Sequence, residues 1–252
     1  DSDLINLIVM FYMAISAMHF GVIYAVFATR SLKPLNNSVI RYYFGSIIVM
    51  SILVMVSLML KEDYDSWGRA AIDSSFTVVS YMSTTGFASC NNASWPWLAA
   101  VVLIFVSIHC GCSGSTTGGI KVDRILIAFK AIGHEIRHRL HPSEISHVRM
   151  SGHHLSDGSV KAVMMYIVTY FLLTFASILI VMLCGETATE AVSGVIASIG
   201  SVGPGLGDLG SLDNYSAQAA VSKFVYTMDM FLGRVEIYPI LVVVSMMFRR
   251  GK

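Results

Sequence analysis

The sequence contains few charged residues. Lys, Arg, Asp and Glu make up 13% of its 252 residues, about half the share that soluble domains usually carry. The two signs nearly balance at a formal net charge of +1, so no overall field would attract nucleic acid. The charges gather in short segments between apolar blocks, and 55% of all residues are hydrophobic. This pattern indicates a membrane protein.

Cysteines are also few, and their positions exclude two kinds of site. Cys110 and Cys112 lie in or beside an apolar segment, while Cys90 and Cys184 stand apart. A disulfide framework or a zinc cluster is therefore not expected, and we interpret Cys110 and Cys112 as small packing residues. The chain starts at Asp1 and lacks the basic region and cleavage site of a signal peptide, so we expect the sequence to be cut at its N-terminus.

Apolar segments predict the transmembrane architecture. A helix needs roughly 20 apolar residues to cross a bilayer, and we expect spans at residues 4–28, 39–60, 98–112, 162–184 and 221–248. Residues 70–82 and 186–198 are too short to cross and too apolar for water, so we interpret them as half-length re-entrant helices. The predicted fold class is an all-α polytopic membrane protein with repeated units of span, short helix, glycine loop and span.

The loop charges orient the chain. Segment 29–41 holds three basic and no acidic residues, and 121–161 holds seven basic against four acidic. Segment 61–97 holds two basic against four acidic, and 185–223 holds one against four. Because basic loops stay on the cytoplasmic side, both glycine loops should enter from outside and the C-terminus should be cytoplasmic.

Two glycine-bearing stretches follow the short helices. They read Ser83-Thr84-Thr85-Gly86-Phe87 and Ser201-Val202-Gly203-Pro204-Gly205. Potassium-channel filters use consecutive backbone carbonyls from about four such strands to replace the water shell of the ion. We therefore predict one strand of a cation filter at each stretch, against the alternative of ordinary surface turns. Two strands do not enclose an ion, so either two chains meet at one pore or two further units precede Asp1.

An internal repeat supports this interpretation. Gly86 and Gly203 are 117 residues apart, and the same shift sets Asp73 against Glu190 near the expected start of each short helix. A carboxylate is favourable there, and the partially negative C-terminal ends of the short helices would face the loops. That arrangement favours a cation over an anion.

Several other patterns carry weaker signals. Four glycines within residues 111–121 cannot continue a stiff helix. Residues 205–210 match the spacing of a dinucleotide fingerprint, but no strand precedes them and no βαβ unit follows. Three histidines at helical spacing could bind a metal or form a plain exposed face. Three of the ionisable residues in the last apolar segment could be a structural group of buried charges or line a polar cavity. The histidines are His134, His138 and His141, and the ionisable residues are Asp229, Arg234 and Glu236.

Four motifs resemble the Trk/Ktr/HKT superfamily of potassium transporters, and most closely its bacterial TrkH-type membrane subunits. They lie at residues 83–87, 114–121, 202–207 and 230–236, in the order of the family, and the resemblance covers essentially the whole chain. The departures are Ser83, where Thr is commoner, and Val235, where Leu is usual. The family has four repeats in one polypeptide, of which the first two are absent here.

The resemblance implies a potassium-selective pore with one filter strand per repeat. Residues 1–28 would be the last transmembrane helix of a preceding repeat, 29–41 a cytoplasmic linker, 39–121 the third repeat, 122–160 a cytoplasmic loop and 161–252 the fourth repeat. The filter would be Thr84, Thr85, Gly86, Ser201, Val202 and Gly203, flanked by Ser83, Phe87, Pro204 and Gly205, with K⁺ held at Thr84, Thr85, Ser201 and Val202.

The resemblance also implies a gate and partners. The gate would be a flexible intramembrane loop together with Arg234, which would project into the pore as an electrostatic barrier. A homodimer in the bacterial inner membrane is expected, with a cytosolic ring of RCK-type (TrkA/KtrA-like) nucleotide-binding subunits and no cofactor besides the transported K⁺. The loop residues are Gly111, Gly114, Ser115, Thr116, Thr117, Gly118, Gly119 and Lys121.

Three alternatives remain open at this point. Within the same family, the chain could be permeable to sodium or couple K⁺ to Na⁺ or H⁺. It could be a non-conducting membrane scaffold or sensor. It could also be an intramembrane enzyme using Asp229, Glu236 and the histidines. Residues 134–138 do match HExxH, but they lie in the charged loop outside the expected spans, and no pair of carboxylates on facing spans is present, so no enzymatic activity is expected.

Overall fold

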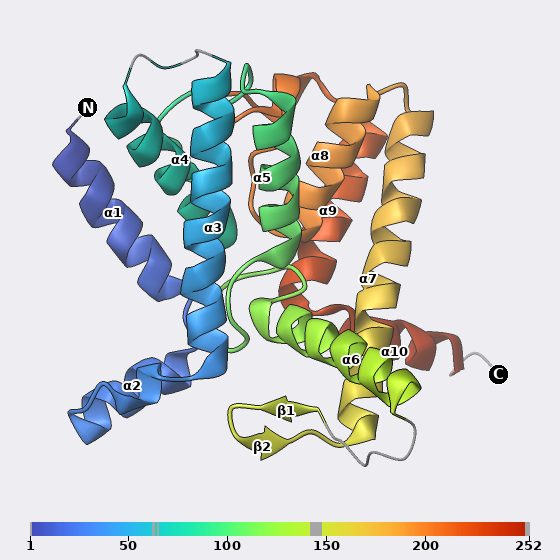
Figure 1. The fold of residues 1–252 in the computed structure, drawn as a ribbon. Coiled ribbons are helices and arrows are strands. Elements are labelled where there is room, and N and C mark those ends of the chain that lie inside the picture. The colour runs from blue at the N-terminus through green and yellow to red at the C-terminus, as the bar shows by residue number, and fades with distance from the viewer. Residues whose placement is uncertain (1, 62–63, 65, 142–147, 250–252) are drawn as a thin grey trace.

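The structure is a computed structural model, and it describes residues 2–61, 64, 66–141 and 148–249. These residues form ten α-helices, three short 3₁₀ helices and one β-hairpin (Figure 1). In chain order they are α1 (Asp3–Ser16), α2 (Phe20–Thr29), η1 (Lys33–Leu35), α3 (Ser38–Leu60), α4 (Trp67–Met82), α5 (Trp97–His109), α6 (Val122–Leu140), β1 (Arg149–Met150), β2 (His153–His154), α7 (Asp157–Leu183), α8 (Ala188–Ile199), η2 (Gly207–Leu209), η3 (Tyr215–Ala217), α9 (Ala220–Val235) and α10 (Ile237–Arg249).

Two of the expected spans are single helices. α3 and α7 have 23 and 27 residues and are apolar enough to cross a membrane unaided. The side chain of Asn37 caps α3 by accepting a hydrogen bond from the amide of Val39, and Ser156 caps α7 in the same way. α7 therefore begins five residues before the start predicted for its apolar segment.

Two other expected spans are broken, which corrects the sequence prediction. Residues 4–28 form α1 and α2, bent by 97°, and residues 221–248 form α9 and α10, bent by 107°. At the first break the imidazole of His19 accepts a hydrogen bond from the amide of Gly21 and starts a new helix. At the second break Glu236 has a left-handed backbone with φ of 68°.

The segment expected as a cytoplasmic loop at 122–160 is largely helical. α6 occupies its first 19 residues, and the hairpin pairs Arg149 with His154 and Met150 with His153. Helical spacing of apolar residues among the charges explains α6, since an amphipathic stripe stabilises a surface helix. The predicted loop also includes residues 142–147, which lie outside the described residues, as do Glu62, Asp63 and Asp65 of the expected acidic loop and Arg250 and Lys252 at the C-terminus.

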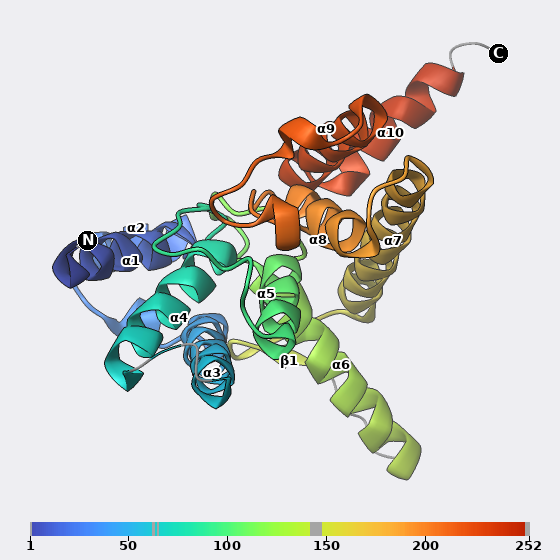
Figure 2. The same ribbon diagram turned by 90° about the horizontal axis from the view of Figure 1, so that it is seen from above.

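The long and short helices have different places in the molecule. α3, α5 and α7 run in roughly the same direction, while α2, α6 and α10 lie crosswise to them toward one end (Figure 1). The short helices α4 and α8 lie inside the protein: ten of the 16 residues of α4 and nine of the 12 residues of α8 are buried. Short, largely buried helices therefore occur where half-length re-entrant helices were predicted. The view from above shows α5 between the group α1, α3, α4 and the group α7, α8, α9 (Figure 2).

Candidate ion pathway

The two glycine loops leave α4 and α8 through the same hydrogen-bonded turn. After α4, the amides of Ser83, Thr84 and Thr85 donate to the carbonyls of Val79, Tyr81 and Ser80 at 2.8, 3.2 and 3.1 Å. After α8, the amides of Gly200, Ser201 and Val202 donate to the carbonyls of Ile196, Ser198 and Ala197 at 2.9, 2.8 and 2.8 Å. Each donor and each acceptor in the second set lies 117 residues after its counterpart, so the sequence repeat is also a repeat of backbone structure.

The backbone angles repeat as well. Thr84 and Ser201 have φ of 54° and 55°, and Gly86 and Gly203 have φ of 70° and 105°. A left-handed conformation costs glycine little, but it strains a residue that carries a side chain. The same alternation of left-handed positions in both loops is a specific shape that the three hydrogen bonds maintain.

The loop carbonyls are available to a cation. Among the residues that the structure describes, no protein donor contacts the carbonyl oxygens of Thr84, Thr85, Gly86, Ser201 or Val202. The carbonyls on either side are occupied: that of Phe87 accepts from Ser80 Oγ at 2.7 Å, and that of Gly203 accepts from Tyr215 Oη at 2.8 Å. Thr85 is exposed, and Thr84, Gly86 and Ser201 are partly exposed, so carbonyls of the two matched loops can take part in binding something else.

The two loops are close to each other. A methyl group added at Gly86 would lie 2.6 Å from the carbonyl oxygen of Val202, so only glycine fits there. The hydroxyl of Tyr81, at the end of α4, donates to the carbonyl of Gly205 at 3.4 Å and accepts from the side-chain amide of Asn92 at 2.8 Å. At Gly203, by contrast, an added methyl group would meet nothing within 4 Å. The structure thus brings the two predicted filter stretches together.

A buried carboxylate links α4 to the segment that follows the first loop. Asp73 is 2% exposed and accepts hydrogen bonds from Tyr64, Arg69 and Ser89 at 3.1, 3.1 and 3.2 Å. Burial and the neighbouring Asp73 raise the pKa of the Tyr64 phenol well above its usual range. α4 begins at Trp67, so Asp73 lies two turns inside the helix and not at its start as predicted. Its equivalent Glu190 does lie in the first turn of α8, where it forms a capping box with Thr187.

The glycine-rich stretch, residues 111–119, contacts the α1–α2 break and the turn after α8. The amide of Cys112 donates to the carbonyl of Ala17 at 2.9 Å, and the amide of Phe20 donates to the carbonyl of Gly114 at 3.1 Å. A methyl group at Gly118 would collide with the carbonyl of Gly200 at the end of α8. The predicted gate residues 111–119 therefore bridge the α1–α2 break and the end of α8. The glycines permit this close backbone contact.

Arg234 reaches the glycine-rich stretch directly. Its guanidinium donates to the backbone carbonyl of Thr116, within residues 111–119. The structure therefore joins two predicted gate components. Asp229 is not a partner of this arginine, since it is buried and accepts from Ser177 Oγ at 2.8 Å.

Lys121 pairs with Glu236 rather than standing alone. Its ammonium lies 3.4 Å from Glu236 Oε1, while Arg124 donates to Glu236 Oε2 at 2.9 Å. The guanidinium of Arg124 also stacks over the ring of Tyr166, 3.9 Å from its centroid. Lys121 and Glu236 have matching backbones (φ of 76° and 68°, ψ of 141° and 147°), and they precede α6 and α10 respectively. The ion pair thus joins two equivalent helix starts.

Some of these residues were not predicted from the sequence. Arg124 and Tyr166 were missed, although Arg124 follows Lys121 at a helical spacing that could have indicated a shared face. His19 was also missed: it caps α2, and its imidazole would lie 3.0 Å from a methyl group at Gly114.

Other predicted candidates lie apart from the pathway. His134 and His138 stack with ring centroids 6.4 Å apart on exposed α6, and no cluster of three or more metal-ligating side chains occurs among the described residues. Residues 205–210 form a loop with the short helix η2. Cys110 and Cys112 are buried, as expected for packing residues.

The chain matches known proteins along nearly its full length. A model of the TrkH family, described as a cation transport protein, matches residues 2–252. The Trk system potassium uptake protein TrkH of Salmonella typhimurium is 30% identical over 251 residues, covering 99% of this chain and 52% of that protein. The potassium uptake protein TrkG of Escherichia coli is 31% identical over 253 residues, covering 100% of this chain and 51% of that protein.

The fold agrees with these matches. The crystal structure of the potassium transporter TrkH from Vibrio parahaemolyticus superimposes with a TM-score of 0.88 at 30% identity, covering 96% of this chain and 52% of that one. The chain spans about half the length of the relatives it matches. It is a helical membrane protein that belongs to the TrkH family of cation transport proteins.

Proposed function

We propose that the chain supplies two strands of a potassium-selective filter in a membrane transport pathway. The observation that carries the proposal is the matched pair of turns after α4 and α8, with five carbonyl oxygens that no described protein group donates to. K⁺ would be held at Thr84, Thr85, Ser201 and Val202, whose carbonyls would replace its water shell. The names of the relatives, which are potassium uptake proteins, support K⁺ as the ion.

The short helices would favour a cation electrostatically. The C-terminal ends of α4 and α8 lead directly into the loops, and a helix C-terminus carries roughly half a negative charge. Two strands would coordinate an ion on only part of its surface, so the complete pathway would need strands from outside this chain.

The gate would consist of residues 111–119 and Arg234. The stretch lies against the end of α8, where it would block ion passage beneath the filter. The guanidinium of Arg234 holds the carbonyl of Thr116 and would place a positive charge next to the path. Opening would require this contact to break.

The protein would act with partners. Several relatives are named as proteins of a Trk system, which supports a multi-component assembly. We propose a homodimer in the bacterial inner membrane, regulated by a cytosolic ring of RCK-type nucleotide-binding subunits. The basic segment 121–161, whose described residues include α6 and the hairpin, is the candidate contact for that ring.

The filter proposal is tested by Gly203→Ser in the intact protein reconstituted into liposomes. Space around Gly203 is open, so serine strains only the left-handed backbone that shapes the strand. We expect the ratio of K⁺ to Na⁺ flux to fall on the order of tenfold, the factor that about 1.4 kcal/mol of barrier produces. Gly86→Ser is less informative, because it would also collide with Val202.

Gly45→Ser is the matched control, since Gly45 lies in α3 with open space around it and without positive φ. It should leave flux and selectivity unchanged. Unaltered selectivity in Gly203→Ser would refute the filter. Wild-type flux no greater than that of protein-free liposomes would instead favour a non-conducting scaffold or sensor. Flux that follows an imposed Na⁺ or H⁺ gradient would instead indicate the ion-coupled alternative.

A further inference from the structure

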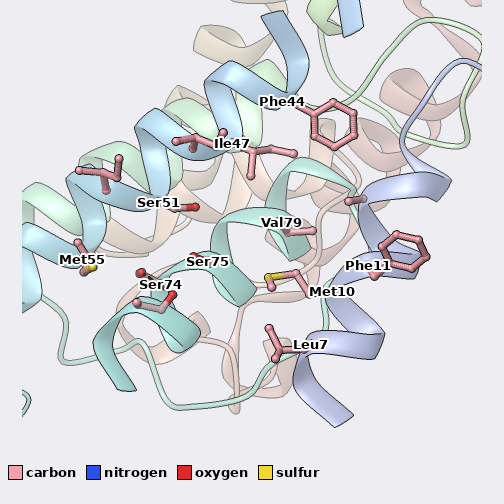
Figure 3. Close-up of a pocket in the computed structure, with 14 residues that line it drawn as sticks. Leu7, Met10, Phe11, Phe44, Ile47, Ser51, Met55, Ser74, Ser75 and Val79 are labelled. Carbon is pink, nitrogen blue, oxygen red and sulfur yellow. Dashed lines mark hydrogen bonds between the residues drawn. The ribbon is translucent and has the colours of Figure 1, made fainter. Parts of the chain in front are cut away.

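An elongated apolar groove lies between α1, α3 and α4, away from the glycine loops. Its volume is about 550 Å³, within the range of small-molecule pockets. Residues 7–14 of α1 and 44–55 of α3 form its walls, and residues 71–79 of α4 form its floor (Figure 3). The floor includes the small side chains of Ala71, Ser74 and Ser75, which leave the space open.

The lining carries no charge. Of its fourteen residues, three are serines and the other eleven are apolar. The Oγ atom of Ser51 is buried and has no hydrogen-bond partner. A serine in a helix can turn its hydroxyl to a carbonyl of the preceding turn, so the groove does not require a polar ligand. Its occupant must therefore be predominantly apolar.

The position of the groove restricts the occupant further. It follows α3, one of the two helices able to cross a membrane unaided. The part of α3 that lines it, residues 44–55, is about 16 Å long at 1.5 Å per residue, and lies within a hydrocarbon layer of about 30 Å. The groove thus runs along the axis of α3, within the depth expected for the hydrocarbon layer.

The rim of the groove is continuous with an exposed apolar surface. Phe11, Ile48 and Ile52 are 61%, 59% and 49% exposed, and Val49 and Leu53 on the adjoining face of α3 are 53% and 41% exposed. These exposed side chains are all apolar, as contact with lipid tails requires. A lipid chain can therefore enter the groove sideways without crossing a polar barrier.

We propose that this groove binds one acyl chain of a bilayer phospholipid. The elongated shape, the uncharged lining and the orientation along α3 fit a hydrocarbon chain aligned with the bilayer normal. The chain would rest on α4, and Val79 at the end of the floor accepts the hydrogen bond that begins the turn at Ser83. Bound lipid would then support the helix that carries the first glycine loop. The site itself does not depend on the proposed ion pathway.

The experiment uses the intact protein in liposomes that contain a phospholipid with a photoactivatable diazirine in the middle of one acyl chain. After illumination, labelled peptides are mapped by mass spectrometry. We expect enriched labelling at Met10 and Met55, which line the groove. Ser75→Leu should fill the floor and lower this labelling about tenfold, as a loss of about 1.4 kcal/mol in binding would.

Val49→Leu is the control, because Val49 faces outward on α3 and does not line the groove. It should preserve the labelling. Ala71→Leu provides a second filling variant if Ser75→Leu does not give a monodisperse protein. Equal labelling of the groove in wild type and both filled variants would overturn the proposal. So would groove peptides left unlabelled while the Val49 face is labelled, because a protein segment would then occupy the groove.

Discussion

At the residue scale, the least predictable feature is the left-handed backbone of Thr84 and Ser201. Their glycine neighbours, Gly86 and Gly203, could be identified from the sequence because glycine tolerates positive φ. A threonine or serine in that conformation costs on the order of 1–3 kcal/mol and has no local sequence signal. Comparing the two loops at a shift of 117 residues is what makes the feature recognisable, since both positions show the same φ within a degree.

Arg234→Ala tests the role of the arginine in the proposed gate. The substitution removes a positive charge and the hydrogen bond to the carbonyl of Thr116. Both effects should favour K⁺ passage, because a fixed cation beside the path repels the ion and the bond restrains residues 111–119. We expect K⁺ flux into liposomes to rise on the order of tenfold, equivalent to about 1.4 kcal/mol of barrier.

Arg234→Lys provides the comparison for that experiment. Lysine keeps the charge but lacks the planar guanidinium, so flux should stay near the wild-type value if charge dominates, and should rise if the bond to Thr116 dominates. Unchanged flux in Arg234→Ala would remove the residue from the mechanism.

At the element scale, the helix breaks limited what the sequence could predict. Residues 4–28 contain no proline, and their apolar character continues through the break between α1 and α2. The break before α10 did have a signal: Pro239 lies in the first turn of α10, where proline is tolerated, and it disfavours helix in the residue before it. α6 was not predicted, because its many charged residues obscure the helical spacing of its apolar residues.

The ion pair between Lys121 and Glu236 joins the starts of α6 and α10, and a charge swap tests it. Lys121→Glu and Glu236→Lys should each alter K⁺ flux through the proposed gate, since each leaves like charges facing each other across a contact of 3.4 Å. The double variant should recover much of the wild-type flux. Because Glu236 is 38% exposed, we expect a coupling energy of only about 0.5–1 kcal/mol.

Arg124 provides an internal check on this swap. It also contacts Glu236, at 2.9 Å, so Glu236→Lys should be more harmful than Lys121→Glu. Strictly additive effects of the two single substitutions would show that the pair does not couple α6 to α10.

At the scale of the whole molecule, the apolar segments and the shift of 117 residues predicted the order and the repetition of the units, and the loop charges predicted their orientation. They could not predict how the two units meet. Gly86 approaches Val202 and Gly118 approaches Gly200 through backbone contacts between distant parts of the chain. Such contacts depend on the absence of side chains, so the sequence shows only a glycine and not its neighbour. The same holds for the two breaks, which place α2 and α10 crosswise at one end of the fold (Figure 1).

Deleting residues 113–117 tests whether this segment, which contacts both repeat units, blocks the proposed pathway. This segment receives hydrogen bonds from Arg234 and from Phe20 of α2, and its flanking residues contact Ala17 and the end of α8. If it blocks the path, the shortened loop should raise K⁺ flux on the order of tenfold or more. Replacing the same five residues with glycines keeps the length and should raise flux less. A monodisperse deletion variant with reduced flux would contradict blocking, and would mean that the segment supports the open pathway instead.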